Sequence, residues 1–108
     1  MGVDVGGSGI KGGIVDLDTG RLASDRFKIL TPRPATPEAV SASIAELVRM
    51  AGWSGPLGCA LPSVVKRGIV RTAANLDPSW IGVDGDDLIG AAVGAPVRLV
   101  NDADAAGV

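Results

Sequence analysis

The chain has 108 residues, 46% hydrophobic and 20% charged, which allows one globular domain with a modest core and excludes two full lobes. Its formal net charge of −2 gives no basic excess, so nucleic acid is not an expected partner. There is no bilayer-spanning apolar stretch, no signal-peptide pattern and only one cysteine, so we expect a cytoplasmic protein that binds a small molecule.

The sequence contains no histidine. This absence removes the commonest general base, any Ser-His-Asp or Cys-His pairing within the chain, and the usual zinc ligand. A catalytic base supplied by this chain is therefore expected to be a carboxylate.

The first thirty residues alternate short apolar runs with turn formers. One run covers Gly2–Val5, and a second covers Gly13–Leu17 and ends at Asp18-Thr19-Gly20. From Arg21 to Leu30 the alternation is less regular, and we expect a third antiparallel strand there. The pattern predicts a β-meander.

A proline-rich connector at 31–37 leads into the clearest helix signal. Thr36 is suited to cap a helix, because Pro37 fits the first helical position and Glu38 adds an acid to the first turn. Gly52 provides the stop. Between them the apolar residues recur with helical spacing: Val40, Ile44, Leu47, Val48 and Ala51.

The remaining sequence predicts a strand, a small hairpin, a loop, a short helix and a last strand. Their ranges are 57–61, 64–70, 73–84, 86–93 and 96–100. Strands followed by alternating helices and strands are typical of an α/β domain with a mixed sheet. Asn101-Asp102 follow the last strand at its carboxyl end, where such sheets bind ligands, and the residues from Ala103 onward look helical.

The glycine-rich stretch from Asp4 to Gly12 has the features of a phosphate-binding turn. Glycines allow positive φ and remove Cβ bulk, so backbone N–H groups can approach phosphate oxygens, and Lys11 adds a positive charge. The stretch also fits the dinucleotide pattern Gly-x-Gly-x-x-Gly, but that pattern requires a helix where Ile14–Leu17 follow. The Walker pattern fails because no Lys-Ser or Lys-Thr follows the second glycine. A plain hairpin without a ligand is the alternative.

Asp4-Val5-Gly6-Gly7-Ser8-Gly9-Ile10-Lys11 resembles the first phosphate motif of the ROK family of sugar kinases. The resemblance implies an actin-like ATPase (ribonuclease H-like) fold of the α/β class, with a mixed β-sheet flanked by helices. Residues 1–108 would form its N-terminal lobe, and the C-terminal lobe is absent from this chain. It also implies that Asp4 orients a hydrated Mg²⁺ and that these residues contact the donor phosphates: Gly6, Gly7, Ser8, Gly9 and Lys11.

The stretch Val97–Ala106 is similar to the family segment that brings an Asn-Asp pair to the sugar. The resemblance implies that Asp102 is the base for the attacking sugar hydroxyl and that Asn101 holds a sugar hydroxyl. A carboxylate in hydrogen-bond reach suits this role, because phosphoryl transfer depends chiefly on positioning and charge stabilisation. A helix cap is the alternative reading of Asp102, and Asp104 is expected to be a first-turn helix acid.

The segment Arg71–Gly82 resembles the branch of the family that phosphorylates glucose with polyphosphate or ATP. The resemblance implies that Asn75 contacts the sugar, whereas an isolated loop asparagine is more often a turn former. Ser63 departs from the common family pattern, in which glycine follows the proline. We expect Trp80 and Cys59 to be core residues.

Taken together, the resemblance implies a phosphotransferase that moves a phosphoryl group from polyphosphate or ATP to the 6-hydroxyl of glucose, with Mg²⁺, in a homodimeric parent protein. The isolated chain is expected to have little turnover, because closure of two lobes completes such a site. Two alternatives stay open: a non-catalytic fragment that binds sugar or phosphate, and an ATP-dependent family kinase for another hexose, such as N-acetylmannosamine or fructose.

Overall fold

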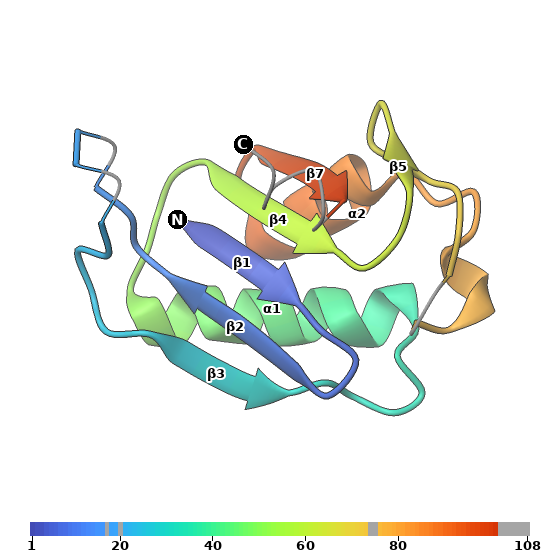
Figure 1. The fold of residues 1–108 in the computed structure, drawn as a ribbon, viewed down its shortest axis with the longest axis horizontal. Helices are drawn as coiled ribbons and strands as arrows, with labels where there is room; N and C mark the ends of the chain where they lie inside the picture. Colours follow the sequence, from blue (N-terminus) through green and yellow to red (C-terminus); the bar gives the residue numbers. More distant parts are fainter. Residues whose placement is uncertain (17, 20, 74–75, 102–108) are drawn as a thin grey trace.

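The computed structural model describes residues 1–16, 18–19, 21–73 and 76–101. They form a five-stranded sheet with the helices on one of its faces (Figure 1). The sheet strands are β1 (Gly2–Val5), β2 (Gly9–Gly13), β3 (Phe27–Leu30), β4 (Leu57–Leu61) and β7 (Val97–Asn101). Their order is β3-β2-β1-β4-β7, with β1, β4 and β7 parallel to one another and β2 antiparallel to both of its neighbours. The predicted mixed sheet with flanking helices is confirmed.

The second strand differs from the prediction. The sequence pattern placed it at Gly13–Leu17, whereas β2 runs from Gly9 to Gly13 and pairs Ile10 with Val5. That prediction was wrong because glycines and a lysine give a weak strand signal, while Ile10 is fully buried and fixes the pairing directly after the turn. Beyond β2, Val15 forms only an isolated bridge with Leu22.

The predicted first helix is confirmed as α1 (Pro37–Ala51). The Thr36 hydroxyl oxygen accepts a hydrogen bond from the Ala39 N–H at 3.2 Å, which satisfies one of the unpaired donors of the first turn. Gly52 ends the helix in the left-handed conformation, with φ of 65°. Its apolar face packs under the sheet with these buried residues: Val40, Ile44, Leu47 and Val48.

The second half of the chain follows the predicted order of elements. A two-stranded hairpin is made of β5 (Val65–Lys66) and β6 (Ile69–Val70), and the helix α2 covers Gly85–Val93. The predicted loop at 73–84 contains a short 3-10 helix at Pro78–Trp80. No helix in the described ranges is long and apolar enough to cross a bilayer.

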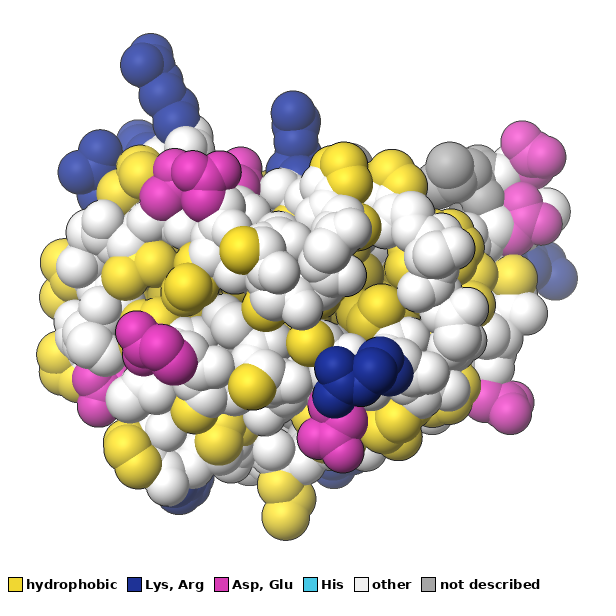
Figure 2. All heavy atoms as spheres, turned by 180° about the vertical axis from the view of Figure 1, so that it is seen from behind, with side chains coloured by type: hydrophobic (Ala, Val, Ile, Leu, Met, Phe, Trp, Pro, Cys, Tyr) yellow, Lys and Arg dark blue, Asp and Glu magenta, His cyan; other side chains and the backbone are white. Residues whose placement is uncertain are grey.

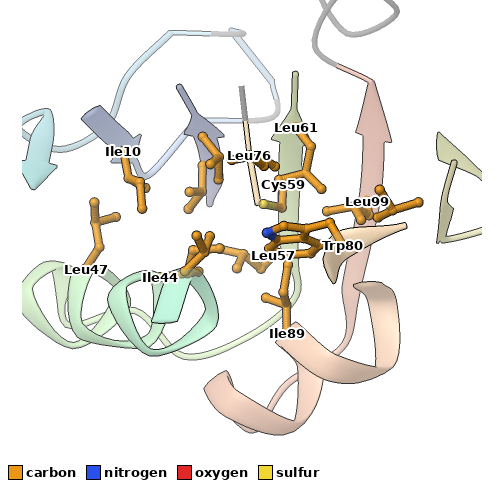
Figure 3. Close-up of a cluster of buried hydrophobic side chains, with 14 of the residues drawn as sticks. Ile10, Ile44, Leu47, Leu57, Cys59, Leu61, Leu76, Trp80, Ile89 and Leu99 are labelled. Carbon is orange, nitrogen blue, oxygen red and sulfur yellow. The ribbon is translucent and has the colours of Figure 1, made fainter. Parts of the chain in front are cut away.

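The core lies between the sheet and the two helices. Figure 3 shows its side chains converging from both layers, with Trp80 and Cys59 among them. Trp80 is fully buried and donates its indole N–H to the carbonyl oxygen of Ala35 at 2.9 Å. Both residues are therefore core residues, as predicted.

The opposite face of the sheet is turned toward the viewer in Figure 1 and includes the exposed charges of Asp4 and Lys11. No described helix covers it. A hollow of about 600 Å³ lies over this face and is lined by glycines together with Asp4, Lys11 and Arg98. The alternation of side chains along each strand thus separates an inner face of large buried apolar residues from an outer face of glycines, smaller apolar residues and charges.

Figure 2 shows the helix-covered side of the molecule. Lys and Arg side chains gather at its upper left, the end that carries β5 in Figure 1. The hairpin region has three exposed cations, Lys66, Arg67 and Arg71. Because the hairpin follows the carboxyl end of β4, this positive charge lies near the edge where the parallel strands end.

Candidate active site

The glycine turn at 6–9 connects β1 to β2 at the edge of the sheet where the parallel strands end. The Gly6 N–H donates to the carbonyl oxygen of Gly9 at 2.9 Å and closes the turn. Within the described residues, the N–H groups of Gly7 and Ser8 donate to no protein acceptor. Two adjacent backbone donors are therefore available to an anion.

The turn has glycine at positions 6 and 9 because neighbouring atoms leave little space for a Cβ there. None of Gly6, Gly7 and Gly9 has a positive φ, so the conformational reason suggested by the sequence does not apply. A Cβ at Gly6 would lie 3.0 Å from the Gly9 carbonyl oxygen, and a Cβ at Gly9 would lie 2.9 Å from Lys28 Cε. A side chain at either position would push into the turn or its neighbour.

Thr31 and Arg33, which follow β3, donate hydrogen bonds to carbonyl oxygens of the turn. Thr31 is 7% exposed, and its hydroxyl donates to the Gly6 carbonyl oxygen at 2.7 Å. Its N–H reaches the Ser8 carbonyl oxygen at 3.4 Å, and Arg33 Nη2 reaches the Gly7 carbonyl oxygen at 3.4 Å. The carbonyl oxygens of the turn thus have donors within the protein, whereas the N–H groups of Gly7 and Ser8 stay available to a ligand.

Sequence reasoning missed Thr31 and Arg33 as residues of the site. The signal that could have found them is the pairing of β3 with β2, which brings the residues after Leu30 beside the turn, because Leu30 lies opposite Gly9. Predicting that pairing would have required the correct start of β2.

Asp4 and Lys11 lie directly opposite each other on β1 and β2, and both are exposed on the open face. Such partners have Cβ atoms about 5 Å apart, within reach of an interaction between opposite charges. Within the described residues, no group of three or more acidic, Cys or His side chains could hold a metal. A lone carboxylate next to a phosphate site nevertheless fits Mg²⁺, which is commonly bound by one or two carboxylates plus substrate phosphates.

Asn101 ends β7 in register with Leu61 of β4. Its side-chain Nδ2 donates to the Ser63 carbonyl oxygen at 2.6 Å. Ser63 is 2% exposed, and its hydroxyl has no hydrogen-bond partner within the described residues. Ser63, which the sequence marked only as a departure from the family pattern, is thus a buried neighbour of Asn101.

The structure brings the glycine turn, Asp4, Lys11 and Asn101 to one edge of the sheet. Strand β4 separates β1 from β7, so the predicted phosphate and sugar ends of the site are two strand spacings, about 10 Å, apart. The other two predicted sugar-side residues, Asn75 and Asp102, lie outside the described residues, and so does Asp104.

Cys59 lies on β4 below this edge and is not a nucleophile of the site. Complete burial, helped by the negative charges of Asp4 and Asp86, raises the pKa of its thiol to about 12. The thiolate, which is the reactive form, is therefore suppressed at neutral pH.

The strand order, the glycine turn after β1 and the polar end of β7 together define a lobe of the actin-like ATPase fold. The chain belongs to the ROK family, whose family model matches residues 1–108.

Curated relatives with similar sequences carry a specific name. The chain is 64% identical to polyphosphate glucokinase of Mycobacterium tuberculosis over 109 aligned positions, which cover all of this chain and 41% of that protein. It is 58% identical to polyphosphate glucokinase of Mycobacterium leprae, again over the whole chain and over 34% of that protein. The chain therefore spans about two fifths or less of the length of these relatives.

Solved structures of similar proteins support the fold. An inorganic polyphosphate/ATP-glucomannokinase from Arthrobacter sp. strain KM matches with a TM-score of 0.94 and 46% identity, over 98% of this chain and 45% of that one. A ROK family glucokinase from Streptomyces griseus, solved with glucose and AMPPNP, matches with a TM-score of 0.85 and 37% identity, over 98% of this chain and 34% of that one.

Proposed function

We propose that residues 1–108 are the N-terminal lobe of a kinase that transfers a phosphoryl group from polyphosphate or ATP to the 6-hydroxyl of glucose. One observation carries this proposal: the anion-binding turn and Asn101 lie at the same edge of one sheet. The names of the relatives support the choice of glucose and of a polyphosphate or ATP donor.

On the donor side, the N–H groups of Gly7 and Ser8 bind oxygens of the terminal phosphates, and Gly6 and Gly9 keep the backbone close to them. Lys11 offsets their negative charge from the neighbouring strand. Asp4 would hold Mg²⁺ through bound water, and the ion when bound neutralises charge that develops on the phosphoryl group.

On the acceptor side, Asn101 and Asn75 orient the sugar, and the Ser63 carbonyl oxygen accepts a hydrogen bond from the Asn101 side chain. The oxygen of the 6-hydroxyl bonds to the terminal phosphorus of the donor while Asp102 takes the hydroxyl proton. The bond from that phosphorus to the rest of the donor breaks. Phosphoryl transfer requires the attacking and leaving oxygens to be roughly in line, so the rest of the donor extends away from the sugar.

The full-length protein is also proposed to act in the cytoplasm and to form a homodimer, and the homodimer rests on the family resemblance. The 108-residue chain alone is expected to have little turnover, because the second lobe excludes water and supplies the rest of the site.

The test is Asp102→Asn in the full-length protein, in a coupled assay of glucose phosphorylation with polyphosphate and with ATP. We expect kcat to fall by about 10²–10⁴-fold with both donors, because a general base typically contributes that much. The matched control is Asp104→Asn, which should keep most of the activity. An unchanged kcat in Asp102→Asn contradicts the catalytic assignment, and a panel of hexoses in the same assay tests the acceptor.

A further inference from the structure

We propose that Lys28 and Arg33 bind the leaving part of an inorganic polyphosphate donor, beyond the terminal phosphates held by the glycine turn. This inference rests on the proposed function, because it assigns the donor of that same site. It comes from the contacts of the segment 28–33, which lies along the turn.

Lys28 lies against one end of the turn. It is opposite Lys11 in the pairing of β2 and β3, and both side chains are exposed on the open face of the sheet. A Cβ built on Gly9 would lie 2.9 Å from Lys28 Cε and 3.8 Å from its Nζ. The ammonium group is therefore next to Gly9, beside the backbone that binds the anion.

Arg33 lies against the middle of the turn. Its Nη2 is 3.4 Å from the Gly7 carbonyl oxygen, and the residue is exposed. A guanidinium group has five N–H donors, so this contact leaves most of them for another acceptor. Lys28 and Arg33 thus place two cations on the same turn from a single segment of chain.

The arrangement of charge favours a polyanion. The row of paired residues across the sheet is Lys28, Lys11, Asp4, Ala60 and Val100, which has two positive charges and one negative charge. Like charges directly opposite each other on neighbouring strands are destabilising. A bound phosphate chain would relieve the repulsion between Lys28 and Lys11.

The strand order indicates in which direction the bound polyphosphate extends. Asn101 is on β7 at one side of the sheet, the turn joins β1 to β2, and Lys28 is on β3 at the other side. In-line transfer requires the leaving group to extend away from the sugar, and in this sheet that direction leads over β3. Polyphosphate has a negative charge on every unit, so its chain continues to gain from cations in that direction.

The experiment measures the binding of inorganic phosphate chains to the full-length protein without sugar, by equilibrium dialysis at two salt concentrations. The ligands are tripolyphosphate and a long polyphosphate of defined length, and the variants are Lys28→Gln, Arg33→Gln and Lys28→Arg. We expect each glutamine variant to bind long polyphosphate about tenfold more weakly, the loss of roughly one charge-assisted hydrogen bond. Tripolyphosphate binding should change by less than about threefold, and Lys28→Arg should stay near wild type.

The matched control is Arg49→Gln, which removes an exposed cation from the last turn of α1 and should leave both affinities unchanged. The affinity of the glutamine variants for long polyphosphate should also depend less on salt, because fewer charges are paired. Equal weakening for both ligands, or no weakening, overturns the inference, since Lys28 and Arg33 would then only support the turn or do nothing.

The same experiment separates this inference from the proposed function. If the wild-type protein binds no long polyphosphate but phosphorylates glucose with ATP, the inference fails and the kinase stands. If the wild type phosphorylates no glucose, yet the variants lose affinity for long polyphosphate, the kinase fails and the polyphosphate site stands.

Discussion

The two faces of the sheet are built from the same strands but have different roles: one packs against the helices and the other presents charges to the solvent. The face toward the helices carries large apolar side chains, such as Ile10, Leu61 and Leu99, which are almost fully buried. The open face carries glycines and charges, among them Asp4 and Lys11. Because side chains alternate along a strand, one short sequence both specifies the fold and presents its charges outward.

Because the two faces differ in this way, substitutions in the core and in the site should have different effects. The packed face is filled by buried side chains, so an added methyl group there should cost stability. At exposed positions of the open face, such as Asp4 and Lys11, substitution should change binding before it changes stability.

A pair of glycine substitutions in the 108-residue chain tests the difference between the two faces with the largest expected effect. A Cβ at Gly12 would lie 2.5 Å from Leu47 Cδ2 and 3.2 Å from the Gly2 carbonyl oxygen, whereas a Cβ at Gly2 meets nothing within 4 Å. We expect Gly12→Ala to lower the free energy of unfolding by about 1–3 kcal/mol, and Gly2→Ala to change it by less than about 0.5 kcal/mol. Urea unfolding measures both, and equal effects would contradict the difference between the faces.

A pair of threonine substitutions, with a smaller expected effect, separates stability from binding at the glycine turn. Thr31→Val removes the hydroxyl that binds the Gly6 carbonyl oxygen, and Thr36→Ala removes the cap of α1. Each should cost about 1 kcal/mol of unfolding free energy. Only Thr31→Val should also weaken tripolyphosphate binding, because Thr31, unlike Thr36, contacts the turn. Weakened binding in both variants would show that the turn responds to stability in general.

The parts of the fold that local sequence signals determine were predictable. Thr36, Pro37 and Gly52 mark the ends of α1, and the structure has the helix between them. The start of β2 was not predictable from apolar periodicity, because Gly9 and Lys11 give no strand signal and the pairing with β1 and β3 decides it.

The candidate site divides in the same way. Asp4, Lys11 and Asn101 lie next to recognisable motifs, and the structure brings all three to one edge. The contacts of Thr31 and Arg33 with the turn depend on the register of β3, which no local pattern specifies. Asn75, Asp102, the metal and the homodimer stay predictions.

The central claim is that an anion site and a sugar site share one edge of the sheet. Amide NMR spectra of the nitrogen-labelled full-length protein, recorded with tripolyphosphate, with glucose and with both, test it most directly. The account predicts that tripolyphosphate shifts the backbone signals of Gly7 and Ser8, that glucose shifts the side-chain amide of Asn101, and that both sets of shifts persist when both ligands are present. Shifts confined to other surfaces, or displacement of one ligand by the other, would contradict it.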